Sequence, residues 1–259
     1  TNQPLEEFQF SYGDLDRFND QLRVQNITKI DSKGKALLIF FESGLTLYSH
    51  NQLYGKWLIV RKGKTPKTNR TQRLVISTLR HSAFLYSASS IELLQPEELE
   101  NHPYLIKLGP DALAEETNWE QVYQQLISSR FEGRSLGSLL LDQHFVAGIG
   151  NYLRSEILHV SRLSPFDRPK DLPANKKRTL SKDILRVTGQ AFVTAGVTND
   201  LSRVSILKEQ GLSRSKYRFA IFARAGLPCY ECGKKIVRSE TNGRRFYSCP
   251  ACQPSVRIL

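Results

Sequence analysis

Four cysteines near the end of the chain are the residues whose types and spacing most directly suggest chemistry. They are the only cysteines in 259 residues, and sixteen residues separate two Cys-x-x-Cys pairs, Cys229 with Cys232 and Cys249 with Cys252. Four thiolates in this arrangement suit tetrahedral Zn²⁺, and the spacing is typical of a zinc ribbon. Two disulfides are the alternative. A cysteine cluster in an otherwise cysteine-free chain favours one structural zinc ion instead.

The segment between the two cysteine pairs is strongly basic. It holds one acidic residue, Glu240, and five basic residues: Lys234, Lys235, Arg238, Arg244 and Arg245. A hairpin of this size has no core of its own, so we expect the metal to hold it together. Arginine side chains bind phosphate through paired hydrogen bonds. The segment therefore predicts a metal-held hairpin that binds nucleic acid.

The composition of the whole chain also indicates a polyanionic partner. Lys and Arg number 37 against 25 Asp and Glu, which gives a net charge of +12 and a pI near 9.6. Nucleic acid is the first expectation and an anionic membrane surface the second. No apolar run approaches the ~20 residues of a membrane span, and no signal peptide is visible. We therefore expect a soluble, intracellular protein.

The elements that must position these residues fall into an N-terminal β part and a later helical part, which predicts an α+β multidomain fold. Residues 1–94 contain short apolar segments separated by turn residues, at 36–41, 45–48, 57–60, 74–79 and 83–86. This spacing predicts an antiparallel sandwich or barrel. The basic run from Arg61 to Arg73 is interpreted as a solvated hairpin rather than a DNA contact. Residues 95–118, rich in proline and acids, are expected to connect two domains.

Helical periodicity begins near residue 119 and extends through a domain predicted at 119–218. Thr117-x-x-Glu120 is expected to cap the first helix, and a longer helix should start near Lys176 and end at Gly196. Between them, the two glycines of Gly148-Ile149-Gly150 allow a tight turn before a further helix. Asn151 then lies near that helix's N-terminus, where backbone N–H groups favour a phosphate. Close helix packing is the alternative reason for these glycines.

Two further regions complete the expected organisation. Residues 196–218 have no clean periodicity and carry Lys208, Arg214, Lys216 and Arg218, so a mobile basic loop is predicted there. Residues 219–259 form the predicted zinc finger.

Several motifs in order resemble one known family. They are Lys33-Gly34-Lys35-Ala36-Leu37, the segment from Leu47 to Gly55, Leu141-Asp142-Gln143 leading to Gly148-Ile149-Gly150-Asn151-Tyr152, and the cysteine ribbon with Gly243-Arg244-Arg245-Phe246-Tyr247. The set is similar to the bacterial endonuclease VIII branch of the formamidopyrimidine-DNA glycosylase family. The resemblance covers nearly the whole chain, and its motifs are specific in combination.

The resemblance implies both a fold and an activity. The fold is an N-terminal β-sandwich, a helical domain with a helix–two-turns–helix motif and a C-terminal zinc finger. The activity is base-excision repair, in which oxidised pyrimidines are removed from double-stranded DNA and the strand is cleaved at the abasic site by β,δ-elimination. In this family an N-terminal proline amine forms a Schiff base with the sugar C1′, and a neighbouring glutamate supplies acid–base catalysis.

Individual residues carry over from the family onto this sequence. Lys35 matches the lysine that contacts phosphate near the lesion and assists elimination, and Arg244 matches the arginine that binds phosphates around the flipped nucleotide. Lys107 and Asn151 match phosphate-binding positions. The remaining three match the loop that fills the gap left by the flipped base: Gln52, Leu53 and Tyr54. As alternatives, Lys35 is an ordinary surface lysine, and Leu53 and Tyr54 are core residues. His50 is expected to be a structural hydrogen-bonding residue.

The sequence departs from the family at its start. Only 34 residues precede Lys35, the family's opening Pro-Glu-Gly-Pro-Glu segment and following helix are absent, and there is no Met. We therefore expect a truncated form of an active enzyme, with apolar surface left uncovered and without excision by residues 1–259 alone. A non-catalytic protein of the same fold that binds damaged or abasic DNA is the first alternative. A zinc-ribbon transcription or RNA-binding factor is the second. The protein is expected to be a cytoplasmic, nucleoid-associated monomer with no membrane partner.

Overall fold

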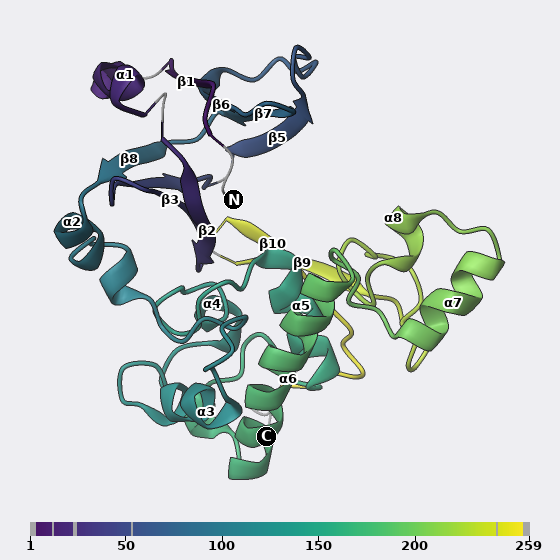
Figure 1. Cartoon of the computed structure of the whole chain (residues 1–259). Helices are drawn as coiled ribbons and strands as arrows, with labels where there is room; N and C mark the ends of the chain where they lie inside the picture. Colours follow the sequence, from purple (N-terminus) through teal and green to yellow (C-terminus); the bar gives the residue numbers. More distant parts are fainter. Residues whose placement is uncertain (1–3, 12, 23–24, 53, 242, 256–259) are drawn as a thin grey trace. The chain divides into compact units, whose positions relative to one another are not determined.

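The chain divides into two compact units, which the computed structural model describes over residues 4–11, 13–22, 25–52, 54–241 and 243–255. The first unit is Thr1–Lys107 and the second is Leu108–Leu259 (Figure 1). The boundary between them falls inside the proline-rich segment 95–118. The finer division into 1–94, 95–118, 119–218 and 219–259 stays a prediction.

The first unit is built mostly of short antiparallel strands. Its elements are β1 (Glu7–Phe10), η1 (Gly13–Phe18), α1 (Asn19–Leu22), β2 (Ile27–Lys33), β3 (Ala36–Phe41), β4 (Thr46–His50), β5 (Lys56–Arg61), β6 (Gln72–Ser77), β7 (His81–Tyr86), β8 (Ser90–Leu94), α2 (Pro96–Glu100) and η2 (Leu105–Lys107). The apolar segments expected to be strands correspond to β3 to β7. The strands β1, β2 and β8 carry a weaker apolar signal, and the sequence does not predict them.

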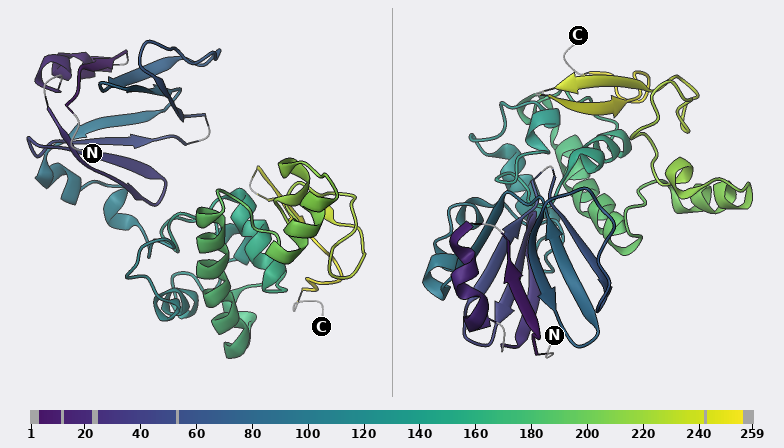
Figure 2. Two further views of the ribbon diagram at one scale, coloured as in Figure 1. Left: turned by 45° about the vertical axis from the view of Figure 1, so that its right-hand side comes forward. Right: turned by 90° about the horizontal axis from the view of Figure 1, so that it is seen from above.

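The strands of the first unit form two antiparallel sheets, in the orders β1-β6-β7-β5 and β2-β3-β4-β8. Figure 2 shows the two sheets as separate layers. Phe8, Leu47 and Leu74 are among the buried side chains of the core they share. The predicted antiparallel sandwich is therefore confirmed.

The sequence of β3 is a nearly unbroken apolar run because both faces of the strand are buried. Ile39 and Phe41 belong to the core shared by the two sheets. The alternate residues Ala36 and Leu38 belong to a second cluster, on which Leu99, Tyr104 and Leu105 pack from the segment after β8. Successive side chains of a strand point to opposite faces. Because both faces of β3 are covered, neither set of side chains alternates with polar residues. The connecting segment is thus fixed to the sandwich by apolar contacts.

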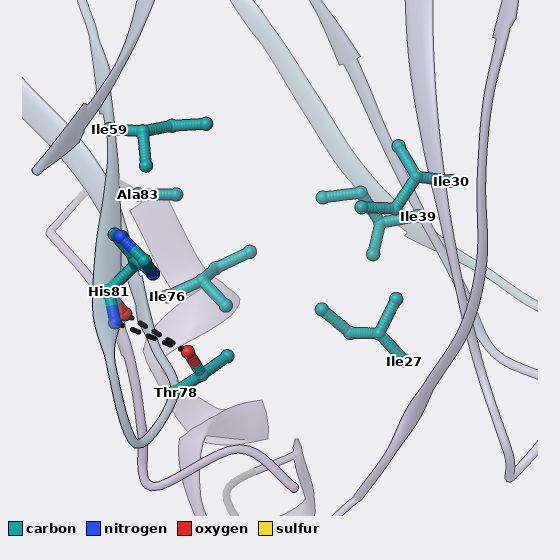
Figure 3. A pocket seen from close by; sticks show the side chains of 8 residues that line it. All are labelled: Ile27, Ile30, Ile39, Ile59, Ile76, Thr78, His81 and Ala83. Carbon is teal, nitrogen blue, oxygen red and sulfur yellow. Dashed lines mark hydrogen bonds between the residues drawn. The ribbon is translucent and has the colours of Figure 1, made fainter. Parts of the chain in front are cut away.

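One open side of the sandwich holds an apolar cavity of about 190 Å³. Figure 3 shows Ile27, Ile30 and Ile39 on one sheet facing Ile59 and Ile76 on the other. Ile30 is 52% exposed and Ile59 is 71% exposed. Apolar side chains therefore line an opening that solvent can enter.

The second unit combines helices with a terminal hairpin. Its elements are α3 (Trp119–Ile127), α4 (Leu136–Leu139), α5 (Asn151–Val160), η3 (Pro169–Asp171), α6 (Ala174–Val193), α7 (Leu201–Glu209), α8 (Arg214–Tyr217), β9 (Val237–Thr241) and β10 (Arg244–Ser248). Leu153 and Ile157 of α5 share one buried cluster with Leu180 and Ile184 of α6. This core holds α5 in place, and the β9–β10 hairpin packs against the same helix.

Two sequence expectations about the helices need correction. The first helix is capped one residue later than expected, because Asn118 and Gln121, rather than Thr117 and Glu120, exchange the capping hydrogen bonds. Residues 196–218 are not an irregular loop, since they contain α7 and α8. Val204 is the only buried residue of α7. Apolar periodicity reports burial, so a helix with almost no buried face gives no periodic signal.

The hairpin predicted between the cysteine pairs is present as the antiparallel strands β9 and β10. No helix within the described residues is long and apolar enough to cross a membrane.

Candidate functional site

Lys35 lies in the turn between β2 and β3, where Gly34 has φ +60°. Its side chain is exposed, and its backbone N–H donates to the Tyr104 hydroxyl at 3.4 Å. His50 pairs with Ala36 across the sheet, and its ring centre lies 5.0 Å from that of Tyr104. Burial, together with the nearby Lys35 charge, lowers the pKa of His50. The segment before η2 therefore contacts both the Lys35 turn and the end of β4.

The predicted gap-filling loop is a tight turn between β4 and β5. The Gln52 backbone has φ +46°, and its N–H donates to Nδ1 of His50 at 3.2 Å. Tyr54 is 70% exposed, so it is not a core residue. Leu53 lies outside the residues that the structure describes. Gly55 donates to the Asn51 carbonyl at 2.7 Å, and a Cβ at Gly55 would lie 2.5 Å from Asn51 Cα. Glycine is therefore required where the loop enters β5.

Asn151 begins α5, as expected, after the turn that follows α4. Gly150 is the N-cap residue, and Gly148 has φ +92°, a conformation that glycine adopts without strain. The Gln143 side chain holds the turn, since it accepts from Gly148 N–H at 3.0 Å and donates to the Ile149 carbonyl at 3.1 Å. The first backbone N–H groups of α5 have no partner within the helix. They can therefore bind an anion.

The structure brings Asn151 and the strand that carries Arg244 together. The Asn151 amide donates to the Arg245 carbonyl of β10 at 2.8 Å. Arg244 is exposed, and within the described part of the chain its guanidinium has no hydrogen-bond or ion-pair partner. Both predicted phosphate ligands therefore lie at one junction between a helix N-terminus and a basic strand.

Arg154 is a residue of this junction that the sequence analysis missed. It is fully buried, and its guanidinium donates to the carbonyls of Gly137 and Arg245, both at 3.0 Å, and to Asn151 Oδ1 at 2.7 Å. Burial, with the nearby Arg244 charge, lowers the pKa of Arg154 to about 10. It therefore links α4, α5 and β10. Its position three residues after Asn151, one helical turn on, is the only signal in the sequence.

Glu156 is a second buried charged residue that the sequence analysis missed. Its carboxylate accepts from the backbone N–H groups of Ala220, Ile221 and Phe222 at 2.7–2.9 Å and from the Thr198 hydroxyl at 2.7 Å. These contacts fix α5 to the segment that leads into the cysteine ribbon.

The four cysteine sulfurs form a cluster that fits a metal ion. All lie within 4.8 Å of one another, with 3.4 Å between Cys232 and Cys249 and 3.9 Å between Cys229 and Cys252. No disulfide joins them. Tetrahedral zinc with bonds of about 2.3 Å separates its sulfurs by similar distances. Burial, and then the neighbouring thiols, raise the pKa of Cys252, so a cation is needed to stabilise four thiolates here.

Lys107 is the last residue of η2 and of the first unit, and its side chain is exposed. The roles of Lys35, Arg244, Lys107, Asn151 and the gap-filling residues in binding and catalysis stay predictions.

Comparison with known proteins identifies the class to which this architecture belongs. Residues 5–87 match the formamidopyrimidine-DNA glycosylase N-terminal domain, and residues 108–202 match the formamidopyrimidine-DNA glycosylase H2TH domain. Among solved structures, the Lactococcus lactis glycosylase bound non-covalently to DNA with an AP site superposes with a TM-score of 0.78 at 19% identity, covering 98% of this chain and 93% of that one. Its complex with FAPY-dG DNA gives 0.79 at 20% identity and the same coverage. These likenesses establish the fold of a DNA glycosylase with a helix–two-turns–helix domain.

Sequence relatives identify the family more closely. The chain is 41% identical over 250 residues to endonuclease 8 of Escherichia coli, covering 96% of this chain and 92% of that protein. It is 41% identical over 249 residues to endonuclease 8 of Salmonella arizonae, covering 96% and 91%. The chain therefore belongs to the formamidopyrimidine-DNA glycosylase and endonuclease 8 family of DNA glycosylases, as its motifs predicted.

Proposed function

We propose that this protein removes oxidised pyrimidines from double-stranded DNA and cleaves the strand at the resulting abasic site by β,δ-elimination. The observation that carries the proposal is the junction of Asn151, Arg154 and β10. There a helix N-terminus and an exposed arginine lie side by side, and both favour phosphate. The 41% identity to endonuclease 8 supports the choice of pyrimidine lesions.

The proposed reaction proceeds through an amine bound to the sugar. An amine attacks C1′ as the damaged base leaves with the electrons of the glycosidic bond. Opening of the sugar ring, with loss of the amine proton, gives the Schiff base; a proton then leaves C2′, and the 3′ phosphate departs with its bonding electrons. A second elimination releases the 5′ phosphate. Lys35 and Arg244 would stabilise the negative charge on these leaving phosphates, since fixed cations act most strongly where charge develops.

Base excision also requires the damaged nucleotide to leave the helix. Gln52, Leu53 and Tyr54 would occupy the resulting gap and compensate for the lost stacking. The exposed side chain of Tyr54 supports this role. Lys107 and Asn151 would bind phosphates and so fix the protein's position on the duplex without reading its sequence. The protein would act as a monomer.

One Zn²⁺ ion is proposed to be held by Cys229, Cys232, Cys249 and Cys252. When bound, the ion supplies a structural cross-link and takes no part in the reaction. The ribbon then presents Arg244 on β10, while Arg154 and Asn151 hold that strand against α5.

A side-by-side excision assay tests this function. With the full-length protein, duplexes carrying thymine glycol or 5-hydroxyuracil should be processed faster than a duplex with 8-oxoguanine opposite cytosine, and borohydride should trap a protein–DNA adduct. The opposite preference would place the protein with the purine-directed glycosylases. Tight binding of abasic DNA by the full-length protein without a trapped adduct would indicate a non-catalytic binder. Equal binding of damaged and intact DNA would favour a general zinc-ribbon nucleic-acid factor.

A further inference from the structure

The register of one sheet places two distant segments at the same end of the sandwich. Lys56, the first residue of β5, pairs with Tyr86 of β7, and Gln72, the first residue of β6, pairs with the same Tyr86. The connection from β5 to β6 must therefore return along the sheet before β6 begins. Its last residues arrive beside the loop that enters β5.

Arg70, near the end of this connection, contacts the gap-filling loop directly. Its guanidinium donates a hydrogen bond to the backbone carbonyl of Tyr54. The Arg70 backbone N–H is itself held by the Thr68 hydroxyl at 3.2 Å. Among the described residues no carboxylate pairs with Arg70. The basic run interpreted from the sequence as a solvated hairpin therefore contains one residue with a specific loop contact.

The contact is the third of three hydrogen bonds that constrain the described residues of the loop. His50 accepts from the Gln52 N–H at the start of the loop. The Asn51 carbonyl accepts from the Gly55 N–H and closes its base. Arg70 binds the Tyr54 carbonyl from outside the loop. An exposed loop that is already ordered loses less conformational entropy when it inserts into DNA.

We propose that Arg70 is a positioning residue that holds Tyr54 in the conformation which fills the gap in damaged DNA. This inference rests on the proposed function of the loop. Because Arg70 acts through the Tyr54 backbone, its effect should appear only on DNA that has a gap to fill. A phosphate contact by Arg70 would instead strengthen binding to damaged and intact duplexes alike.

Two matched variants separate these roles. Arg70→Gln removes the charged donor. Lys67→Gln removes one positive charge from an exposed residue of the same connection. Among the described residues, Lys67 has no hydrogen bond or ion pair with the loop. Each is titrated with a duplex holding a tetrahydrofuran abasic analogue beside 2-aminopurine and with the intact duplex. The dissociation constants give the selectivity ratio, and the fluorescence at saturation reports insertion beside the gap.

We expect Arg70→Gln to lower the abasic-to-intact selectivity by about fivefold, the size of one typical net hydrogen bond, and to reduce the 2-aminopurine signal at saturation. Lys67→Gln should leave both quantities unchanged. Arg70→Lys, which keeps a charged donor, should recover part of the loss.

Equal selectivity in Arg70→Gln and Lys67→Gln would overturn the inference, as would a loss in Arg70→Gln that is the same for both duplexes. A failure of the loop's gap-filling role is distinguishable, because the unaltered protein would then show no preference for abasic DNA. A failure of catalysis alone would leave that preference intact and would appear as the absence of a borohydride-trapped adduct.

Discussion

Arg154 shows how one buried side chain can organise exposed ones. Its guanidinium replaces water around the carbonyls of Gly137 and Arg245 and around the Asn151 side chain. Asn151 and β10 are thereby fixed before any DNA arrives. The residues predicted to touch phosphate are consequently held in place by one that does not reach the surface.

Replacing Arg154 by lysine should destabilise the second unit and weaken DNA binding. Lysine has a single donor group and cannot satisfy the separate acceptors, so buried carbonyls lose partners at a cost of about 3 kcal/mol. The thermal midpoint and the dissociation constant for abasic DNA measure the two effects. Arg162→Lys, at an exposed position just after the same helix, is the control. Equal midpoints for the two variants would contradict the organising role.

His50 should make gap recognition sensitive to pH. Burial, and then the Lys35 charge, lower its pKa from the ordinary value of about 6.5. The Gln52 N–H needs the neutral Nδ1 as acceptor. The pKa of His50 is lower in the folded protein than in the unfolded chain. The stabilisation that neutral His50 contributes is therefore complete above about pH 6.5, and it is lost as the pH falls through the pKa of the folded state.

The expected result is a decline in abasic-to-intact selectivity as the pH falls from 7.5 towards 5. His50→Gln keeps a side-chain acceptor without titrating, so its selectivity should depend less on pH. His81→Gln, at an exposed position in the same unit, should retain the full decline. A parallel decline in both variants would assign the effect to other groups.

At the scale of elements, the β9–β10 hairpin depends on two attachments. The cysteine cluster fixes one end of it, and α5 holds β10 through Asn151, Arg154 and the Ser155 hydroxyl, which accepts from the Tyr247 N–H at 3.2 Å. The buried cluster around the cysteines is small: Ile221, Cys229, Ile236 and Cys249. So small a core does not hold two strands together without the metal.

Removing the metal should therefore abolish the hairpin's contribution to DNA binding. Cys249→Ser should lower the zinc content well below one ion per chain and weaken abasic DNA binding at least tenfold, since metal binding and folding of such a ribbon are coupled. Elemental analysis and a binding titration measure both. Treatment with 1,10-phenanthroline should reproduce the loss, and the non-chelating 1,7-isomer should not. Unchanged DNA binding by zinc-free protein would refute the dependence.

For the whole molecule, the charge of +12 predicts DNA binding that weakens steeply with salt. Each phosphate contact contributes about one unit to the slope of log K against log salt. Arg244→Ala should reduce that slope by about one and weaken binding to all sequences. Lys177→Ala removes one partly buried charge from α6 and serves as the comparison. An unchanged slope for Arg244→Ala would mean that Arg244 does not touch phosphate.

The sequence alone determined those features that depend on local spacing. The cysteine pairs, the turn before Asn151, the strands from β3 to β7 and the long helix α6 were all predictable, because metal ligation, glycine conformation and apolar periodicity leave marks at short range. The family was predictable because several such motifs occur in one order.

Only the tertiary structure revealed contacts between segments far apart in the chain. Arg154 and Glu156 read as ordinary helix residues until burial shows which carbonyls and N–H groups they satisfy. Arg70 reads as one charge in a basic run until the register of β5, β7 and β6 brings it beside Tyr54. The helix α7 escaped prediction for a related reason, since it buries almost nothing. A sequence records which faces are buried, whereas the partners of a buried charge or a backbone carbonyl are fixed only when the chain has folded.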